Sequence, residues 1–355
     1  MEHYLPSWPR YVISVEHFSI TIAAGATTNT ATISRVNTAL SFLTFGGFTS
    51  QAAGTDLSRE AFAYAQLTDA TTVTATRNTA DANDTVTVKG CVVQCSPQLV
   101  ASIQTGTISM TTLETSQTAT INAVDTGRSV VIYNGCISNA GNDNIDATVQ
   151  RLTLTNPTTV TGARHIAAAA TAAVAFTVVE FQPSIVTRLQ QFAQTLTSAT
   201  ASDTLAISPN VDPERSLLFF GGFSTSNNPY DDGFYKAALT NGSTVTLSRD
   251  PAGNATGTRT INGTVVEFAH GVLRRVTRGT TDLSGVTSNT TTIPLVDKAM
   301  TLHHYCGFSC DIASAGPLGQ GCTAAALTDY STVTATRDGA GTAIGTVGWE
   351  AAWFN

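Results

Sequence analysis

The stretch LTDATTVTATR at residues 67–77 returns as LTDYSTVTATR at residues 327–337, 260 positions later. Two further versions, LTNPTTVTGAR at 154–164 and LTNGSTVTLSR at 239–249, make four copies. Each copy ends in arginine, and the four arginines lie 87, 85 and 88 residues apart. Self-similarity at a fixed period is typical of a repeat architecture. The chain is therefore built from four similar units.

Other landmarks move in step with this phrase. Upstream of each copy an apolar run reaches a glycine, and a valine followed by Asn or Asp stands eleven residues before that glycine. These glycines are Gly47, Gly135, Gly222 and Gly307. A strand-like run such as VVEF at 265–268 closes each unit. The landmarks predict an N-terminal arm at 1–10 and four units, at 11–97, 98–183, 184–271 and 272–355.

Within a unit, alternation of apolar and polar residues dominates over helical periodicity. The most apolar segments, including SLLFF at 216–220, directly precede the glycines and predict the core of each unit. Inside the repeated phrase, Leu-Thr followed by Asn or Asp and small residues predicts a tight turn between two strands. About five to seven strands per unit, with turns every 8–12 residues, favour a sandwich. We therefore expect an all-β fold of four tandem antiparallel β-sandwich repeats of about 85 residues.

Composition narrows the functional classes. The net charge is −7, only 12% of residues are charged, and no basic cluster exceeds the Arg274-Arg275 pair. These features argue against a nucleic-acid partner. No apolar run reaches the length of about 18 residues that a spanning helix needs, so membrane insertion is not expected. The N-terminus, MEHYLPSWPRYVIS, lacks the apolar segment of a secretory signal peptide.

Six cysteines are scattered over three of the units. Cys91 and Cys95 are four residues apart, which on a strand separates their sulfurs by about 13 Å, too far for a bridge. Cys310 and Cys322 flank one loop and are the pair that could form a disulfide. Buried thiols are the expectation for the others.

The four phrase arginines invite a structural and a functional interpretation. In the structural one, each arginine pairs across strands with a residue of the closing strand and holds the hairpin in register. In the alternative, the arginines read a ligand. Recurrence in every unit favours the structural interpretation, because a binding site is rarely kept in every copy while its loops diverge. The expected pairs are Arg77 with Gln94, Arg164 with Glu180, Arg249 with Glu267, and Arg337 with Glu350.

Catalytic, cofactor and metal sites have little support in the sequence. None of the six histidines recurs at a matched position, and the adjacent His303 and His304 point to opposite faces of a strand. Motifs such as GxSxG, HExxH or a phosphate-binding glycine loop do not occur. We therefore expect no enzymatic activity, no cofactor and no metal.

The variable loops after the glycines are the places where ligand binding is expected, if it occurs. In unit 3, SNNPYDDGFY at 226–235 offers Tyr230 as a stacking platform beside Asp231 and Asp232. Such a group suits sugar hydroxyls or Ca²⁺. Solvated turns or contacts between subunits explain the same loop.

The repeated pattern also carries a family resemblance over residues 11–355. An opening strand after Pro or Gly, the Val-Asp and glycine steps, the repeated phrase and the closing VVEF together resemble units of predicted phage and prophage fibre proteins. The Pro-x-Val opening and VVEFAHG at 265–271 are similar to the H-type lectin fold, a six-stranded sandwich that typically trimerises. The lectin comparison bears on fold more than on sugar binding.

This resemblance implies a non-enzymatic virion structural protein, as a fibre, collar or decoration component, that assembles with other virion proteins and as a homo-oligomer, either a trimer or another symmetric ring. It would be made in the host cytoplasm without a signal peptide and reside in the virion. The first ten residues, which include Tyr4 and Trp8, would form an arm that docks on another virion protein. A flexible terminus is the alternative.

Two rival functions differ in class. A carbohydrate-binding adhesin would recognise host-surface glycan through the loops of the repeats. A bacterial surface-layer repeat protein would need an export signal, which the N-terminus does not offer.

Overall fold

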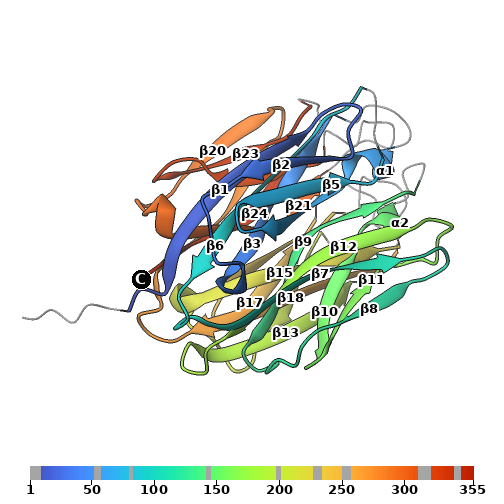
Figure 1. Ribbon diagram of the computed structural model, residues 1–355. Coiled ribbons are helices and arrows are strands. Elements are labelled where there is room, and N and C mark those ends of the chain that lie inside the picture. The colour runs from blue at the N-terminus through green and yellow to red at the C-terminus, as the bar shows by residue number, and fades with distance from the viewer. Residues whose placement is uncertain are drawn as a thin grey trace, which may run out of the picture.

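The computed structural model describes residues 9–51, 57–79, 83–140, 145–196, 201–226, 234–249, 257–310, 321–339 and 345–355. Within them each unit has six strands (Figure 1). Unit 1 contains β1 (Val12–Ile22), β2 (Thr28–Thr32), β3 (Ser41–Ser50), β4 (Ala63–Asp69), β5 (Thr72–Arg77) and β6 (Val86–Cys95). Unit 2 contains β7 (Val100–Met110), β8 (Ser116–Thr120), β9 (Ser129–Ser138), β10 (Arg151–Asn156), β11 (Thr159–Ala163) and β12 (Ala172–Phe181). Unit 3 contains β13 (Val186–Leu196), β14 (Ser202–Ala206), β15 (Ser216–Thr225), β16 (Lys236–Asn241), β17 (Thr244–Ser248) and β18 (Arg259–Phe268). Unit 4 contains β19 (Leu273–Asp282), β20 (Ser288–Thr292), β21 (Thr301–Cys310), β22 (Ala324–Leu327), β23 (Thr332–Thr336) and β24 (Gly345–Phe354).

Short helical turns connect some of these strands. The helices α1 (Leu57–Ala61) and α2 (Ile145–Thr148) precede the fourth strands of units 1 and 2. The 3₁₀ turns η1 (Thr38–Leu40), η2 (Pro213–Arg215) and η4 (Lys298–Met300) precede the third strands of units 1, 3 and 4. These turns explain the Asn or Asp that follows the landmark valine in units 1, 3 and 4. In η2, for example, the Asp212 side chain caps the turn by accepting from the backbone N–H of Glu214 at 3.0 Å.

Each unit divides into two antiparallel halves. In unit 1 the strands β1, β6 and β3 form one half, and β2, β5 and β4 form the other, and the remaining units repeat this order. The repeated phrase forms the hairpin between the fourth and fifth strands, as predicted. In unit 1, Leu67 pairs with Val73 across the turn, and Asp69 Oδ1 accepts from the backbone N–H of Thr71 at 2.7 Å.

Neighbouring units share sheets. The fourth strand of each unit joins the third strand of the next unit, so each of the four sheets has six strands drawn from two units. The joining residue pairs are Tyr64 with Gly135, Arg151 with Gly222, Lys236 with Gly307, and Ala324 with Gly47. The last pair joins unit 4 back to unit 1, and the backbone N–H of Tyr11 donates to the Asn355 carbonyl at 2.8 Å. The four antiparallel sheets are arranged as a four-bladed β-propeller.

The expected tandem β-sandwich repeats are therefore wrong, although the all-β class is right. A tandem sandwich would complete its sheets within one unit. Here the fourth strand of each unit would be an open edge if the unit stood alone, and the next unit covers that edge. Alternation along a strand identifies its buried face but not its neighbour in the sheet, so the sequence pattern suited both arrangements.

The four landmark glycines are the points where consecutive units join. All four have positive φ, between +86° and +101°. A Cβ built on each would lie only 2.2 to 2.4 Å from a backbone carbonyl oxygen next to or within the fourth strand of the preceding unit. No other residue type fits both the backbone conformation and this close approach.

A ring of aromatic side chains links the third strands of all four units. Phe45, Tyr133, Phe220 and Tyr305 occupy the same position in β3, β9, β15 and β21. Each ring packs edge-on against its neighbours, with centroids 6.0 to 6.3 Å apart and interplanar angles of 82° to 87°. Edge-to-face geometry is the favoured arrangement for such pairs. Every unit thus contributes one ring to a shared cyclic core.

A second contact pairs an aromatic residue with a glycine across the first and last strands of each unit. The ring comes from the first strand in units 1 and 3 and from the last strand in units 2 and 4. The cross-strand pairs are Phe18 with Gly90, Phe192 with Gly263, Phe176 with Gly106, and Trp349 with Gly279. A Cβ on any of these glycines would lie 2.3 to 2.7 Å from a ring atom, so each ring covers a bare backbone.

Candidate functional site

The four phrase arginines are buried, with 1% to 5% of their surface exposed. Arg77 donates to the carbonyls of Ala23, Ala26 and Asp84 at 2.8 to 3.1 Å. Arg164 likewise donates to the carbonyl of Thr111 at 3.0 Å and to that of Ala170 at 2.7 Å. A guanidinium offers five donors, so one side chain can fix two loops at once. The contacts of these two arginines are structural.

The predicted partners of these arginines lie elsewhere. Glu180 contacts Arg128 at 2.6 Å, and Glu267 contacts Arg215 at 2.8 Å. The acids predicted as partners of Arg164 and Arg249 are thus engaged by Arg128 and Arg215. In unit 1, Gln94 is approached at 3.5 Å by the hydroxyl of Ser14. Arg77, for example, is the last residue of β5, where carbonyls of two loops accept its hydrogen bonds.

Glu350 also occupies a different register from the one expected. Trp353 pairs with Thr301 in unit 4, as Glu267 pairs with Ser216 in unit 3. Glu350 instead lies opposite His304, the position that pairs Phe219 with Thr264 in unit 3. Matching Glu350 to Glu267 by sequence therefore places Glu350 three residues away from its position in the strand ladder.

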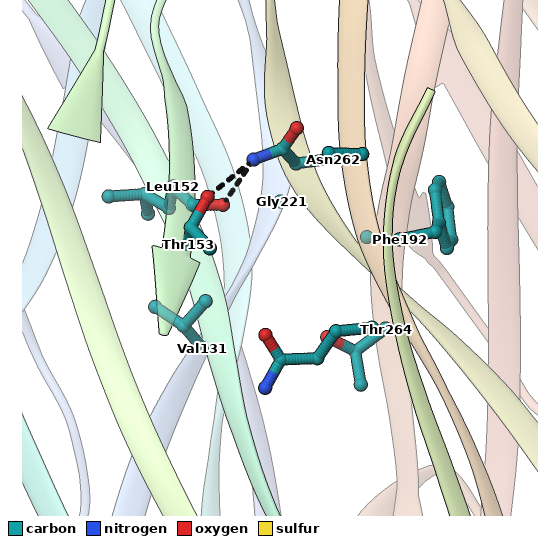
Figure 2. Close-up of a pocket in the computed structure, with 10 residues that line it drawn as sticks. Val131, Leu152, Thr153, Phe192, Gly221, Asn262 and Thr264 are labelled. Carbon is teal, nitrogen blue, oxygen red and sulfur yellow. Dashed lines mark hydrogen bonds between the residues drawn. The ribbon is translucent and has the colours of Figure 1, made fainter. Parts of the chain in front are cut away.

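Two equivalent unit junctions contain partly open cavities. Between units 2 and 3, a cavity of about 220 Å³ is lined by the third and fourth strands of unit 2 and by the first, third and sixth strands of unit 3. Figure 2 shows Asn262 at its edge, where the side-chain amide donates to the Leu152 carbonyl at 2.9 Å and to the Thr153 hydroxyl at 2.7 Å. Val131, Phe192 and other groups complete a mostly apolar lining.

The matching cavity between units 3 and 4 has a volume of about 150 Å³, and its lining includes the charged pair of Arg278 and Glu350. Arg278 donates from Nε to Glu350 Oε1 at 2.8 Å and from Nη2 to the Pro213 carbonyl of unit 3 at 2.8 Å. Glu350 Oε2 accepts from the backbone N–H of Leu218, also in unit 3, at 2.9 Å. The carboxylate and the guanidinium thus join the two units.

Two more reactive side chains lie beside Glu350. His304 Nε2 is 3.4 Å from Glu350 Oε2, and the Cys306 thiol also belongs to this cluster. All three residues are only 2% to 3% exposed. Burial and the nearby Glu350 carboxylate raise the pKa of the Cys306 thiol well above its ordinary value. Burial opposes ionisation of Glu350, but Arg278, His304 and the Leu218 N–H outweigh it and lower the pKa of the carboxyl.

A larger open groove is lined by residues of units 3 and 4. Its volume is about 950 Å³, and its lining includes Arg215, His270, Arg274, Arg275 and Arg278 against the two acids Asp212 and Glu214. The Arg274 guanidinium lies 4.4 Å from the centre of the Trp353 ring. The chain has a net charge of −7, so the excess of basic residues in this groove is opposite in sign to the charge of the whole chain.

The other predicted features are the loop of unit 3, the N-terminal arm and the disulfide. Tyr230, Asp231 and Asp232 lie outside the described residues, as do the first eight residues of the arm. The structure has Cys310 and Cys322 as buried thiols, so the disulfide considered between them is not formed. In the part of the chain that the structure describes, no helix is long and apolar enough to span a bilayer.

Sequence reasoning missed the cluster of His304, Cys306 and Glu350. The sequence carried a signal for His304 and Cys306, whose positions hold other residue types in units 1, 2 and 3, but not for Glu350, which matches Glu180 and Glu267 by letter. No model of a known protein family matches this chain, and a comparison with curated proteins finds no significant relative.

Proposed function

We propose that this protein is a non-enzymatic structural component of a bacteriophage virion, a fibre, collar or decoration element that works through protein–protein contacts. The observation that carries the proposal is that buried charged side chains hold loops and units together. Arg164 binds loop carbonyls, and Arg278 with Glu350 joins two units. Charged groups held in this way rigidify a fold rather than leave it free for chemistry.

Closure of the ring fits a mechanical role in a virus particle. The Ala324 to Gly47 bridge and the Tyr11 to Asn355 hydrogen bond bring the last unit against the first. The ring cannot open without breaking this joint and burying less of the shared aromatic core. Assembly with other virion proteins and with further copies of the chain, in a trimer or another symmetric ring, is part of the proposal.

The test is the protein content of particles. Virions of a phage that carries this gene would be purified, and their proteins quantified by mass spectrometry, with antibodies to the full chain used to locate it by electron microscopy. We expect a fixed number of copies per particle at one site. Presence in the infected-cell lysate without presence in purified particles would overturn the proposal.

A carbohydrate-binding adhesin is the second candidate, and the basic groove favours it. Arg274 stacked on Trp353, with Arg275 and His270 alongside, offers both a cationic and an aromatic surface to an acidic sugar. The full chain would be applied to a glycan array that includes carboxylated and phosphorylated glycans. Binding lost in Arg274→Ala but kept in the exposed control Arg35→Ala would support the groove.

The same array separates the groove from the loop of unit 3. Saturable binding lost on replacing Tyr230 and Asp231 by alanine, and kept in Arg274→Ala, would place recognition in the loop. An array with no saturable binding would remove the adhesin candidate and leave the structural proposal to the particle experiment.

A further inference from the structure

The buried cluster at the junction of units 3 and 4 contains three side chains that bind transition metals. His304 and Cys306 lie on β21, and Glu350 lies on β24. One ligand atom from each residue lies within 4.8 Å of the other two. Imidazole nitrogen, thiolate sulfur and carboxylate oxygen form the mixed donor set typical of Zn²⁺.

The imidazole of His304 has unused hydrogen-bonding capacity. It is 3% exposed, yet neither ring nitrogen forms a hydrogen bond among the described residues. The 3.4 Å approach of Nε2 to Glu350 Oε2 is an ion-pair distance without hydrogen-bond alignment. A buried polar group without a hydrogen bond is costly, by about 1–3 kcal/mol for a neutral group, and calls for an explanation.

The other units lack this combination. The His304–Glu350 cross-strand pair corresponds to Thr44–Cys91, Ile132–Thr177 and Phe219–Thr264 in units 1, 2 and 3. The position of Cys306 corresponds to Gly46, Asn134 and Gly221. At these three positions, all of which the structure describes, ligand-type residues occur together only in unit 4. An ion pair with Arg278 explains Glu350, but it explains neither His304 nor Cys306.

We propose that His304, Cys306 and Glu350 bind one divalent ion of the zinc type at the junction of units 3 and 4. A tetrahedral ion with bonds of about 2.0–2.3 Å would hold its donors about 3.3–3.7 Å apart. The spacing of His304 Nε2 and Glu350 Oε2 already falls in this range. The cavity beside Cys306 and Glu350 has room for a water as the fourth ligand.

The surroundings suit an ion held for structure. Arg278 holds Glu350 Oε1, which leaves Oε2 directed toward His304. Binding would replace the thiol proton of Cys306, which leaves as H⁺ while the sulfur bonds to the metal. The thiolate and the Glu350 carboxylate then supply two negative charges against the two positive charges of the ion and the one of Arg278. The bound ion would stabilise β21 against β24 at the point where Leu218 of unit 3 contacts Glu350.

Metal binding by the full chain tests this proposal. The purified protein would be treated with a chelator, desalted, and titrated with Zn²⁺ or Co²⁺ alone. We expect one ion per chain by elemental analysis, a thiolate-to-cobalt charge-transfer band in the near ultraviolet, and a higher thermal midpoint with Zn²⁺. His304→Thr and Cys306→Gly use residues that unit 1 carries at these positions, so we expect both to fold and to lose the ion.

Cys310→Ser is the matched control, because it removes another buried thiol of β21 and should keep the ion. If Cys306→Gly does not fold, Cys306→Ser replaces it, and the same loss of the cobalt band is expected. Zinc bound equally by wild type and by the His304 and Cys306 variants would overturn the proposal. So would wild-type protein that retains no ion and shows no thermal shift.

Discussion

Replacing Gly307 with alanine should weaken the joint between units 3 and 4. Gly307 has φ +93°, and a Cβ at this position would lie 2.2 Å from the carbonyl oxygen of Tyr235 and 2.8 Å from the Cα of Lys236. Both contacts are with backbone, so no side-chain rotation can relieve them. β16 would have to move away from β21, which breaks the Lys236 to Gly307 bridge.

Gly285, in the same unit, separates the two sources of the loss. It has φ +71°, but nothing lies within 4 Å of its Cβ position. Alanine should therefore cost only the left-handed backbone term at Gly285, about 1–2 kcal/mol. At Gly307 the forced contact adds the penalty of overpacking, about 1–3 kcal/mol. We expect the Gly307→Ala variant to be less stable than Gly285→Ala by that second amount.

Urea titration of the two variants, followed by tryptophan fluorescence, would measure both losses against the wild type. Unit 4 carries Trp349 and Trp353, so the signal reports on the unit that is changed. Equal losses in the two variants would refute the close approach of β16 to β21. Without that approach, the sharing of sheets between units would lose its main support.

Three further predictions follow from other contacts. Phe176→Ala should lower the free energy of unfolding by about 3–5 kcal/mol. Exchanging the pair, with Phe176→Gly and Gly106→Phe in one chain, should recover most of the loss in a double-mutant cycle. Additive losses would contradict the pairing. Arg164→Met should cost about 3 kcal/mol in urea titration because it leaves buried carbonyls without a donor, and a loss near zero would contradict its structural role. Burial and Lys298 lower the pKa of His17 from 6.5 to about 4, so the unfolded chain binds a proton that the folded chain does not, and stability should fall by up to about 3 kcal/mol as the pH drops from about 6.5 to about 4. His17→Gln should flatten that part of the pH profile, while His303, whose pKa burial also lowers, should leave a pH-dependent loss of its own; an unchanged profile would contradict the assignment.

The local features of a unit were predictable from the sequence. The hairpin of the repeated phrase depends on a short-range turn, in which Asp69 accepts from the N–H of Thr71, and on alternation in the flanking strands. The glycine landmarks were also visible, since Gly135 and its counterparts recur at matched positions. Their role was not, because it depends on a backbone carbonyl in another unit.

The arrangement of the units could not be read from these patterns. Every residue of β15 is buried, which the apolar run SLLFF correctly predicted as core. The run does not reveal that β15 joins β10 of unit 2 through Gly222. Pairing between units depends on which strand edge is left open, and local alternation carries no information on that.

The position of Glu350 in the candidate metal cluster also could not be predicted from the local sequence pattern. Glu350 in GWEA matches Glu267 in VVEF by letter, and that match placed it beside the phrase arginine. The ladder of β24 places it three residues away from that position, opposite His304 and in contact with the backbone of unit 3. A carboxylate at a strand end and one at a unit junction differ in solvation, partners and chemistry. Only the register of the hydrogen bonds distinguishes them. That register pairs Glu350 with His304, a residue for which the sequence predicted no metal.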